Sequence, residues 1–122
     1  MTPTKRILIV DDEEAIAETL QFILQEEGYD VATSNDGGEL EGDLVNGSRP
    51  DLVILDYWLP RKNGDEIARS LKSDKHTAHI PIIMISASNN ISEIAKTAGV
   101  DDFIPKPFDF DEILSKVKKH LN

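Results

Sequence analysis

The chain has 122 residues, the size of one domain with room for a substantial core, and we expect a single domain over residues 1–122. Its formal net charge of −10 argues against direct binding to nucleic acid, because phosphate backbones favour lysine and arginine. The absence of cysteine excludes disulfides and thiolate metal sites, and it fits a reducing, cytoplasmic setting. No apolar stretch approaches the roughly 20 residues that a membrane span needs, so we expect no membrane association.

The first third of the chain alternates strand and helix. Lys5–Val10 is predicted to be an apolar strand, and it runs directly into four acidic residues that begin at Asp11. Ala15–Glu27 carries apolar residues at helical spacing, and Gly28 stands where a left-handed residue commonly ends a helix. Tyr29–Thr33 predicts a shorter, more polar strand, which is typical of a sheet edge.

The middle of the chain contains the most apolar strand. Asp36–Asn46 predicts a helix, although three glycines lower its helical propensity. Leu52–Leu55 is a run of aliphatic residues typical of a strand buried on both faces, and it stops at the carboxylate of Asp56. A short helix over Gly64–Lys72 and an apolar strand over Pro81–Ile85 follow.

The last third repeats the alternation. Ile91–Ala98 predicts a helix, Asp101–Ile104 a short strand, and Asp109–Leu121 a final helix with an apolar stripe that includes Phe110. Strict strand–helix alternation predicts an α/β fold, a doubly wound parallel sheet of five strands with five helices on its two faces.

In a parallel sheet the carboxyl ends of all strands lie at one edge. We therefore expect that edge to bring together polar residues that follow different strands: Asp11, Asp12, Asp56, Ser86 and Lys106. Neighbouring carboxylates repel one another, and a hard divalent cation such as Mg²⁺ relieves that repulsion. Acids, metal, lysine and hydroxyl together match the needs of phosphoryl transfer, with a carboxylate as the nucleophile.

Each of these residues also has an ordinary structural interpretation. Asp11-x-x-Glu14 matches a helix capping box, and Asp56 could simply end a strand before a turn. Ser86 fits a turn or a helix cap, and Lys106 fits an exposed loop. Their joint occurrence at one edge favours the functional interpretation, because helix capping requires no lysine there.

These residues, in this order and spacing, resemble the receiver domain of two-component response regulators over essentially the whole chain, in the manner of single-domain chemotaxis regulators. The matching positions are Asp11-Asp12, Asp56, Pro60 and Gly64, Ser86-Ala87, and Lys106-Pro107-Phe108. The resemblance implies a flavodoxin-like sheet with strand order 2-1-3-4-5. It also implies that Asp56 accepts a phosphoryl group from a histidine kinase or a histidine phosphotransfer protein, or slowly from small acyl phosphates.

The resemblance further assigns a metal site. Asp12 and Asp56 would bind Mg²⁺ directly together with the backbone carbonyl of Trp58, and Asp11 would act through water. Trp58 is unusually bulky for its position two residues beyond the phosphoacceptor, a position that in this family helps to set the dephosphorylation rate.

The remaining roles implied by the resemblance concern the phosphoryl group and the switch. Lys106 would contact the phosphoryl oxygens, and its bond to Pro107 would be cis. Ser86 would move to donate a hydrogen bond to the phosphoryl group, beside a suitably small Ala87. Phe103 would be the switch aromatic, although it lacks the hydroxyl of the commoner tyrosine.

The sequence leaves three candidate functions to compare. The first is a phosphorylation-driven switch, not an enzyme acting on an external substrate, in which Mg²⁺ and phosphate change the surface of the last two helices and the last strand for a downstream protein target. The second is a binding module that works without phosphorylation, which would not need three crowded acids. The third is an aspartyl-phosphate phosphohydrolase, but Trp58 stands where that family has a second aspartate. A single-domain regulator and one domain of a longer protein both remain open.

Overall fold

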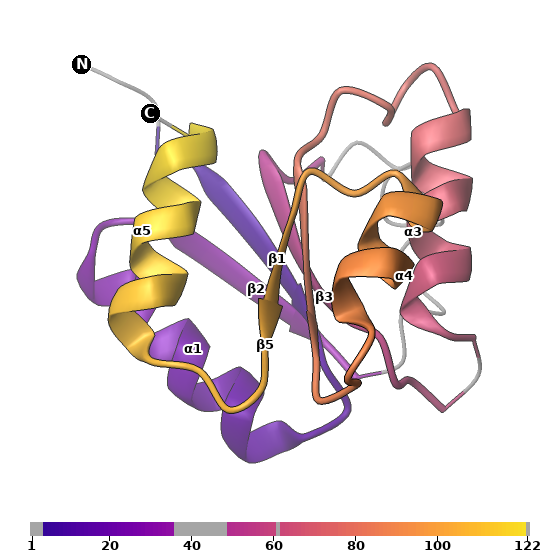
Figure 1. The fold of residues 1–122 in the computed structure, drawn as a ribbon. Coiled ribbons are helices and arrows are strands. Elements are labelled where there is room, and N and C mark those ends of the chain that lie inside the picture. Colours follow the sequence, from indigo (N-terminus) through magenta and orange to yellow (C-terminus); the bar gives the residue numbers. More distant parts are fainter. Residues whose placement is uncertain (1–3, 36–48, 61, 122) are drawn as a thin grey trace.

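The computed structural model describes residues 4–35, 49–60 and 62–121. Five parallel strands form one sheet (Figure 1). They are β1 Arg6–Val10, β2 Asp30–Ser34, β3 Leu52–Asp56, β4 Ile82–Ser86 and β5 Asp102–Pro105. Their order is β2-β1-β3-β4-β5, so the predicted topology is confirmed and β2 lies at an edge as its polar sequence indicated.

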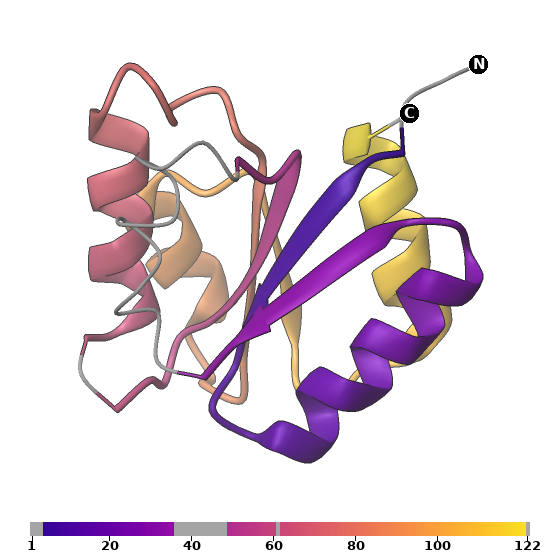
Figure 2. The same cartoon turned by 180° about the vertical axis from the view of Figure 1, so that it is seen from behind.

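The described residues form four helices, whereas five were predicted for the chain. They are α1 Glu14–Glu26, α3 Gly64–Ser73, α4 Ile91–Ala98 and α5 Phe110–Leu121. The predicted helix over Asp36–Asn46 lies outside the described residues. Helices α1 and α5 cover one face of the sheet, and α3 and α4 cover the other (Figures 1 and 2).

Alternation of side chains along the strands divides the core into two layers. In β3, Val53 and Leu55 face the layer under α3 and α4, and Leu52 and Ile54 face the layer under α1 and α5. All four residues have no exposed surface. Because both faces are covered, the strand has to be apolar throughout, which explains the unbroken aliphatic run in the sequence.

The helices bury the stripes that the sequence indicated, with one exception. In α3 the buried residues include Ile67, Ala68 and Leu71. In α5, Ile113 and Val117 are buried, but Phe110 is 45% exposed, so its placement on the inner stripe was wrong. Phe110 is the first residue of α5, and its ring lies against Phe108 at the surface cleft beside Lys106 instead of in the core.

Asp102, at the start of β5, ties this strand to α5. Its carboxylate accepts hydrogen bonds from Lys116 Nζ at 2.7 Å and from the Phe103 backbone N–H at 3.0 Å. His120 Nε2 lies 3.1 Å from its other oxygen, and Lys119 Nζ lies at 3.7 Å. Burial alone would raise the pKa of Asp102, but the hydrogen bonds from Lys116, His120 and Phe103 lower it to about 2.

Replacing Asp102 with asparagine is therefore expected to destabilise the protein by about 2 kcal/mol at pH 7, since one pKa unit corresponds to about 1.4 kcal/mol. The folded-state pKa lies below the ordinary value of 3.8, so this stabilisation is complete above 3.8 and is lost as pH falls towards about 2. Urea unfolding at pH 7 and pH 3 measures the effect, with the exposed Asp111→Asn as a matched control. An Asp102→Asn deficit that is the same at both pH values would contradict this account.

Candidate functional site

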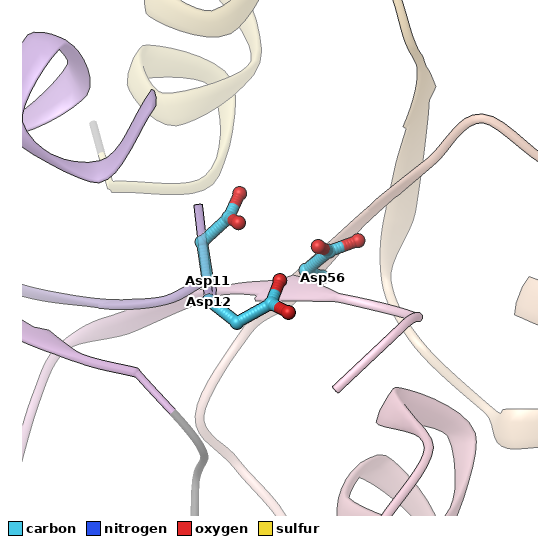
Figure 3. A group of neighbouring side chains, drawn as sticks. All are labelled: Asp11, Asp12 and Asp56. Atoms are coloured by element: carbon cyan, nitrogen blue, oxygen red, sulfur yellow. The ribbon is translucent and has the colours of Figure 1, made fainter. Parts of the chain in front are cut away.

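Three carboxylates meet where β1 and β3 end, at the lower edge of the sheet in Figure 1. Asp11 and Asp12 follow β1, and Asp56 is the last residue of β3 (Figure 3). One oxygen from each lies within 4.8 Å of the others. Asp11 and Asp56 are only 1% and 2% exposed, whereas Asp12 is exposed. The cluster therefore has two buried acids with a third at its solvent side.

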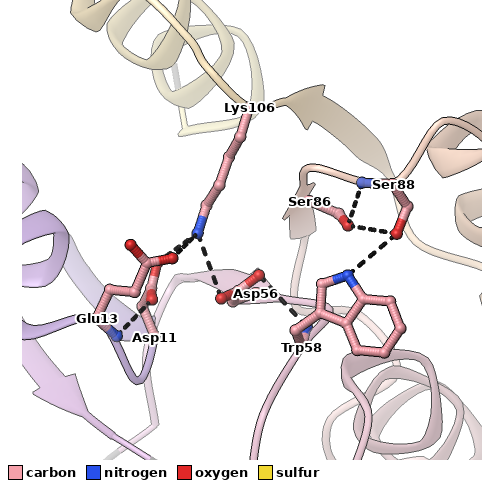
Figure 4. Close-up of polar contacts among 7 residues, drawn as sticks. All are labelled: Asp11, Glu13, Asp56, Trp58, Ser86, Ser88 and Lys106. Atoms are coloured by element: carbon pink, nitrogen blue, oxygen red, sulfur yellow. Dashed lines mark hydrogen bonds and ion pairs between the residues drawn. The ribbon is translucent and has the colours of Figure 1, made fainter.

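The ammonium group of Lys106 reaches the cluster from the loop after β5 (Figure 4). Its Nζ lies 3.4 Å from Asp56 Oδ2, 3.5 Å from Asp11 Oδ2 and 3.1 Å from Glu13 Oε1. The parallel topology explains how residues so far apart in the sequence meet here. Among the residues that the structure describes, one lysine thus faces three carboxylates, and their negative charge exceeds its positive charge.

This excess charge changes the protonation of both partners. Burial and the neighbouring carboxylate of Asp11 raise the pKa of Asp56 to about 6, although Lys106 opposes the shift. Burial lowers the pKa of Lys106, but Asp56, Asp11 and Glu13 outweigh it, and the pKa rises above its ordinary value. Lys106 is therefore a fixed positive charge at neutral pH, and Asp56 ionises at a higher pH than an ordinary aspartate does.

The donor set fits a hard divalent cation. Carboxylate oxygens are the ligands that Mg²⁺ prefers, and Mg²⁺ binds through one or two carboxylates while it retains several waters. The exposed Asp12 leaves one side of the cluster open to such water. The expected role of the Trp58 backbone carbonyl as a magnesium ligand stays a prediction. The backbone N–H of Trp58 lies 3.4 Å from Asp56 Oδ1.

The loop after β4 places a second set of polar groups beside Asp56. Ser86, the last residue of β4, has no exposed surface, and its hydroxyl donates to Ser88 Oγ at 3.0 Å. Ser88 Oγ also accepts a hydrogen bond from the Trp58 indole N–H at 3.1 Å. In Figure 4 this chain of hydrogen bonds and Lys106 lie on opposite sides of Asp56.

The other predicted residues lie as follows. The Lys106–Pro107 peptide bond is cis, so that prediction is confirmed. Phe103 is half-buried in β5, with Lys116 Nζ 5.7 Å from its ring centroid. Ala87 lines a cleft of about 500 Å³ between α1 and the loop before α5, together with Lys106 and mainly apolar residues: Ala15, Ile16, Thr19, Pro107, Phe108 and Phe110.

Sequence reasoning missed two residues of this site. Glu13 is a partner of Lys106, and Ser88 links Ser86 to Trp58. The capping-box interpretation of Asp11 was wrong, because the N-cap residue of α1 is Glu13, and Asp11 Oδ1 accepts the backbone N–H of Glu13 at 2.9 Å. In the sequence, only the position of Glu13 directly after Asp11 and Asp12 could have indicated that it contacts Lys106.

The chain thus combines a parallel sheet of order 2-1-3-4-5 with an acid cluster and a lysine at its carboxyl edge. The family model of the response regulator receiver domain matches residues 7–118, and the chain belongs to this family. Receiver domains bind Mg²⁺ at this acid cluster and interact with histidine kinases.

Named relatives agree with this assignment. The chain is 40% identical over 118 residues to the response regulator MprA of Mycobacterium sp. (strain KMS), which covers 95% of this chain and 50% of that protein. The chain thus spans about half the length of the curated relatives it matches.

Solved structures of receiver domains are also similar. The response regulator TrrA of Thermotoga maritima, solved in complex with Mg²⁺-BeF, is 38% identical, with a TM-score of 0.84 and coverage of 97% of this chain and 100% of that one. The chemotaxis response regulator CheY4 of Vibrio cholerae is 26% identical, with a TM-score of 0.88 and coverage of 98% and 100%. Among the described residues, no helix has the length and apolar character to cross a bilayer.

Proposed function

We propose that this receiver domain is a phosphorylation-driven switch in which Asp56 accepts the phosphoryl group. The observation that carries the proposal is the meeting of the buried Asp56 carboxylate with Lys106 Nζ at 3.4 Å beside two further acids. We assign the domain to residues 1–122, which the family match over 7–118 supports. The switch is not an enzyme for an external substrate, since its own aspartate is the acceptor.

In the proposed step, an Asp56 carboxylate oxygen attacks the phosphorus of the donor. A new O–P bond forms, and the bond from phosphorus to the leaving histidine nitrogen, or to the acyl oxygen of a small acyl phosphate, breaks. Lys106 contacts the phosphoryl oxygens and offsets their charge, since its ammonium is already beside Asp56. Ser86 then donates a hydrogen bond to a phosphoryl oxygen, and Phe103 changes its packing behind the site.

Magnesium is the proposed cofactor. Asp12, Asp56 and the Trp58 carbonyl would hold the ion directly and Asp11 through water, and the bound ion would neutralise charge on the carboxylates and phosphoryl oxygens. The acid cluster within 4.8 Å supports this, as does the Mg²⁺-BeF complex of the TrrA relative. The donor would be a histidine kinase or a histidine phosphotransfer protein, and the output a downstream protein target that reads the surface of α4, β5 and α5.

The alternative of a binding module independent of phosphorylation has less support. A scaffold gains no stability from two buried acids that raise each other's cost of ionisation. The apolar cleft beside Lys106 does offer a protein contact, but it borders the same site and therefore fits a phosphodonor as well.

Intact mass spectrometry after incubation with Mg²⁺ and acetyl phosphate tests the proposal. We expect the mass to increase by one phosphoryl group, and we expect this increase to disappear with EDTA and in Asp56→Asn. Asp111→Asn, which removes an exposed acid from α5, should be phosphorylated like the unsubstituted protein. A phosphoryl gain that persists in Asp56→Asn would contradict the assignment.

A further inference from the structure

The hydroxyl of Ser86 makes its hydrogen bonds to Ser88 rather than to Asp56. It donates to Ser88 Oγ at 3.0 Å and accepts the backbone N–H of Ser88 at 3.0 Å. A serine hydroxyl has one proton, so it can donate to one acceptor at a time. Ser86 therefore cannot donate to a phosphoryl group on Asp56 while its proton is given to Ser88.

Trp58 holds in place the oxygen that accepts this proton, Ser88 Oγ. Its indole N–H donates to Ser88 Oγ at 3.1 Å, which joins the loop after β3 to the loop after β4 (Figure 4). The ring packs edge-on against Tyr57 with centroids 4.8 Å apart, although 56% of Trp58 is exposed. An exposed tryptophan at this place contributes little to the core, so its directed N–H is the feature that needs an explanation.

We propose that Trp58 acts through Ser88 as a positioning residue. It holds the Ser86 hydroxyl in the arrangement that it has before Asp56 is phosphorylated. The inference rests on the proposed role of Ser86 in contacting the phosphoryl group. The Trp58 N–H fixes the side chain of Ser88 so that its oxygen faces Ser86. Phosphorylation has to break the Ser86–Ser88 hydrogen bond, and the tryptophan makes that break less favourable.

The expected size of the effect follows from one hydrogen bond. A typical intramolecular hydrogen bond contributes about 0.5–1.5 kcal/mol net, which corresponds to about a 2- to 10-fold change in an equilibrium constant. Trp58→Phe removes the N–H and keeps an aromatic ring. Ser88→Ala removes the shared acceptor and keeps the tryptophan. Both variants are expected to bind a phosphoryl mimic about 2- to 10-fold more tightly than the unsubstituted protein does.

The test is a calorimetric titration of the full chain with beryllofluoride in the presence of Mg²⁺. The samples are the unsubstituted protein, Trp58→Phe, Ser88→Ala and the double variant, with Ser73→Ala as a matched loss of an exposed serine hydrogen bond at the end of α3. Ser88→Thr keeps the hydroxyl and should restore the binding of the unsubstituted protein. The double variant should bind no tighter than either single variant, because both interrupt the same chain.

Fluorescence gives an independent readout, since Trp58 is the only tryptophan in the chain. Beryllofluoride should change its emission in the unsubstituted protein and much less in Ser88→Ala, whose indole has already lost its partner. If Trp58→Phe does not fold, Ser88→Ala and its fluorescence decide the question.

The outcomes separate the two proposals. Failure of the unsubstituted protein to bind beryllofluoride with Mg²⁺ would overturn the proposed function and this inference together. Normal binding in that protein, with Ser88→Ala unchanged or weaker, would overturn the inference alone. The same holds if Trp58→Phe binds tighter and Ser88→Ala does not, because the bulk of the ring would then be the cause.

Discussion

Replacing Asp56 with asparagine is expected to stabilise the metal-free protein at neutral pH by a few kcal/mol. Burial and the Asp11 carboxylate raise the pKa of Asp56 to about 6, from an ordinary value of 3.8. Keeping the group ionised in the folded state is therefore unfavourable, at about 1.4 kcal/mol for each pKa unit. An amide of the same shape removes the charge and can still accept a hydrogen bond from Lys106.

The pH dependence of this effect has a definite sign. The folded state binds a proton on Asp56 more tightly than the unfolded state does, so the unsubstituted protein loses stability as pH rises from about 4 to about 6. Asp56→Asn lacks this term. The difference between the two proteins should thus be small at pH 4 and reach its full size above pH 6.

Urea unfolding in EDTA at pH 4, 6 and 8 measures the difference. Added Mg²⁺ should stabilise the unsubstituted protein, since the ion binds the folded state, and should stabilise Asp56→Asn much less. Asp111→Asn controls for the loss of one negative charge at an exposed site. An Asp56→Asn protein less stable than the unsubstituted protein at pH 8 in EDTA would show that the acid cluster does not crowd Asp56 as described.

Replacing Gly64 with alanine is expected to damage both the fold and the site. Gly64 begins α3, and its N–H donates to the Tyr57 carbonyl at 2.7 Å. An added Cβ would collide with the backbone carbonyl oxygen of Asp56 and lie 2.9 Å from Tyr57 Cα. Since these neighbours are backbone atoms, the loop after β3 has to move, at about 1–3 kcal/mol or more.

Gly28→Ala is the matched control for this substitution. Gly28 has a φ of 98°, but a Cβ there would meet nothing within 4 Å. Its replacement should cost about 1 kcal/mol through backbone strain alone and should leave phosphorylation unchanged. Gly64→Ala should lose stability and also incorporate phosphate from acetyl phosphate more slowly, because Asp56 shifts. A Gly64→Ala protein that matches Gly28→Ala in both measurements would contradict this close approach.

The sequence was sufficient to predict most of the fold because the two strongest local signals agree. Aliphatic runs such as Leu52–Leu55 indicate strands covered on both faces, and the glycines Gly28 and Gly99 mark helix ends, where the structure has φ of 98° and 75°. Strict alternation then requires parallel strands, and parallel strands bring Asp11, Asp56 and their partners to one edge. Topology, rather than any single motif, made the acid cluster predictable.

What the sequence could not indicate depends on side-chain direction and on reach. Glu13 was predicted only as one of a run of acids, yet the long lysine side chain brings Lys106 Nζ within 3.1 Å of it. Ser88 gave no signal, because its role depends on where the Trp58 indole points. Phe110 follows the helical period of α5 and is nevertheless 45% exposed, because its ring lines a surface cleft and lies against Phe108.

The most direct test of the central claim is to locate the phosphoryl group within the chain. After reaction with acetyl phosphate and Mg²⁺, borohydride reduces an aspartyl phosphate to a primary alcohol with loss of phosphate, and peptide mass mapping then identifies the altered residue. We predict alteration at Asp56 alone, absent when EDTA is present. Alteration at Asp11 or Asp12 with Asp56 intact, or none in a folded protein that binds Mg²⁺ and beryllofluoride, would contradict the claim that Asp56 is the phosphoacceptor.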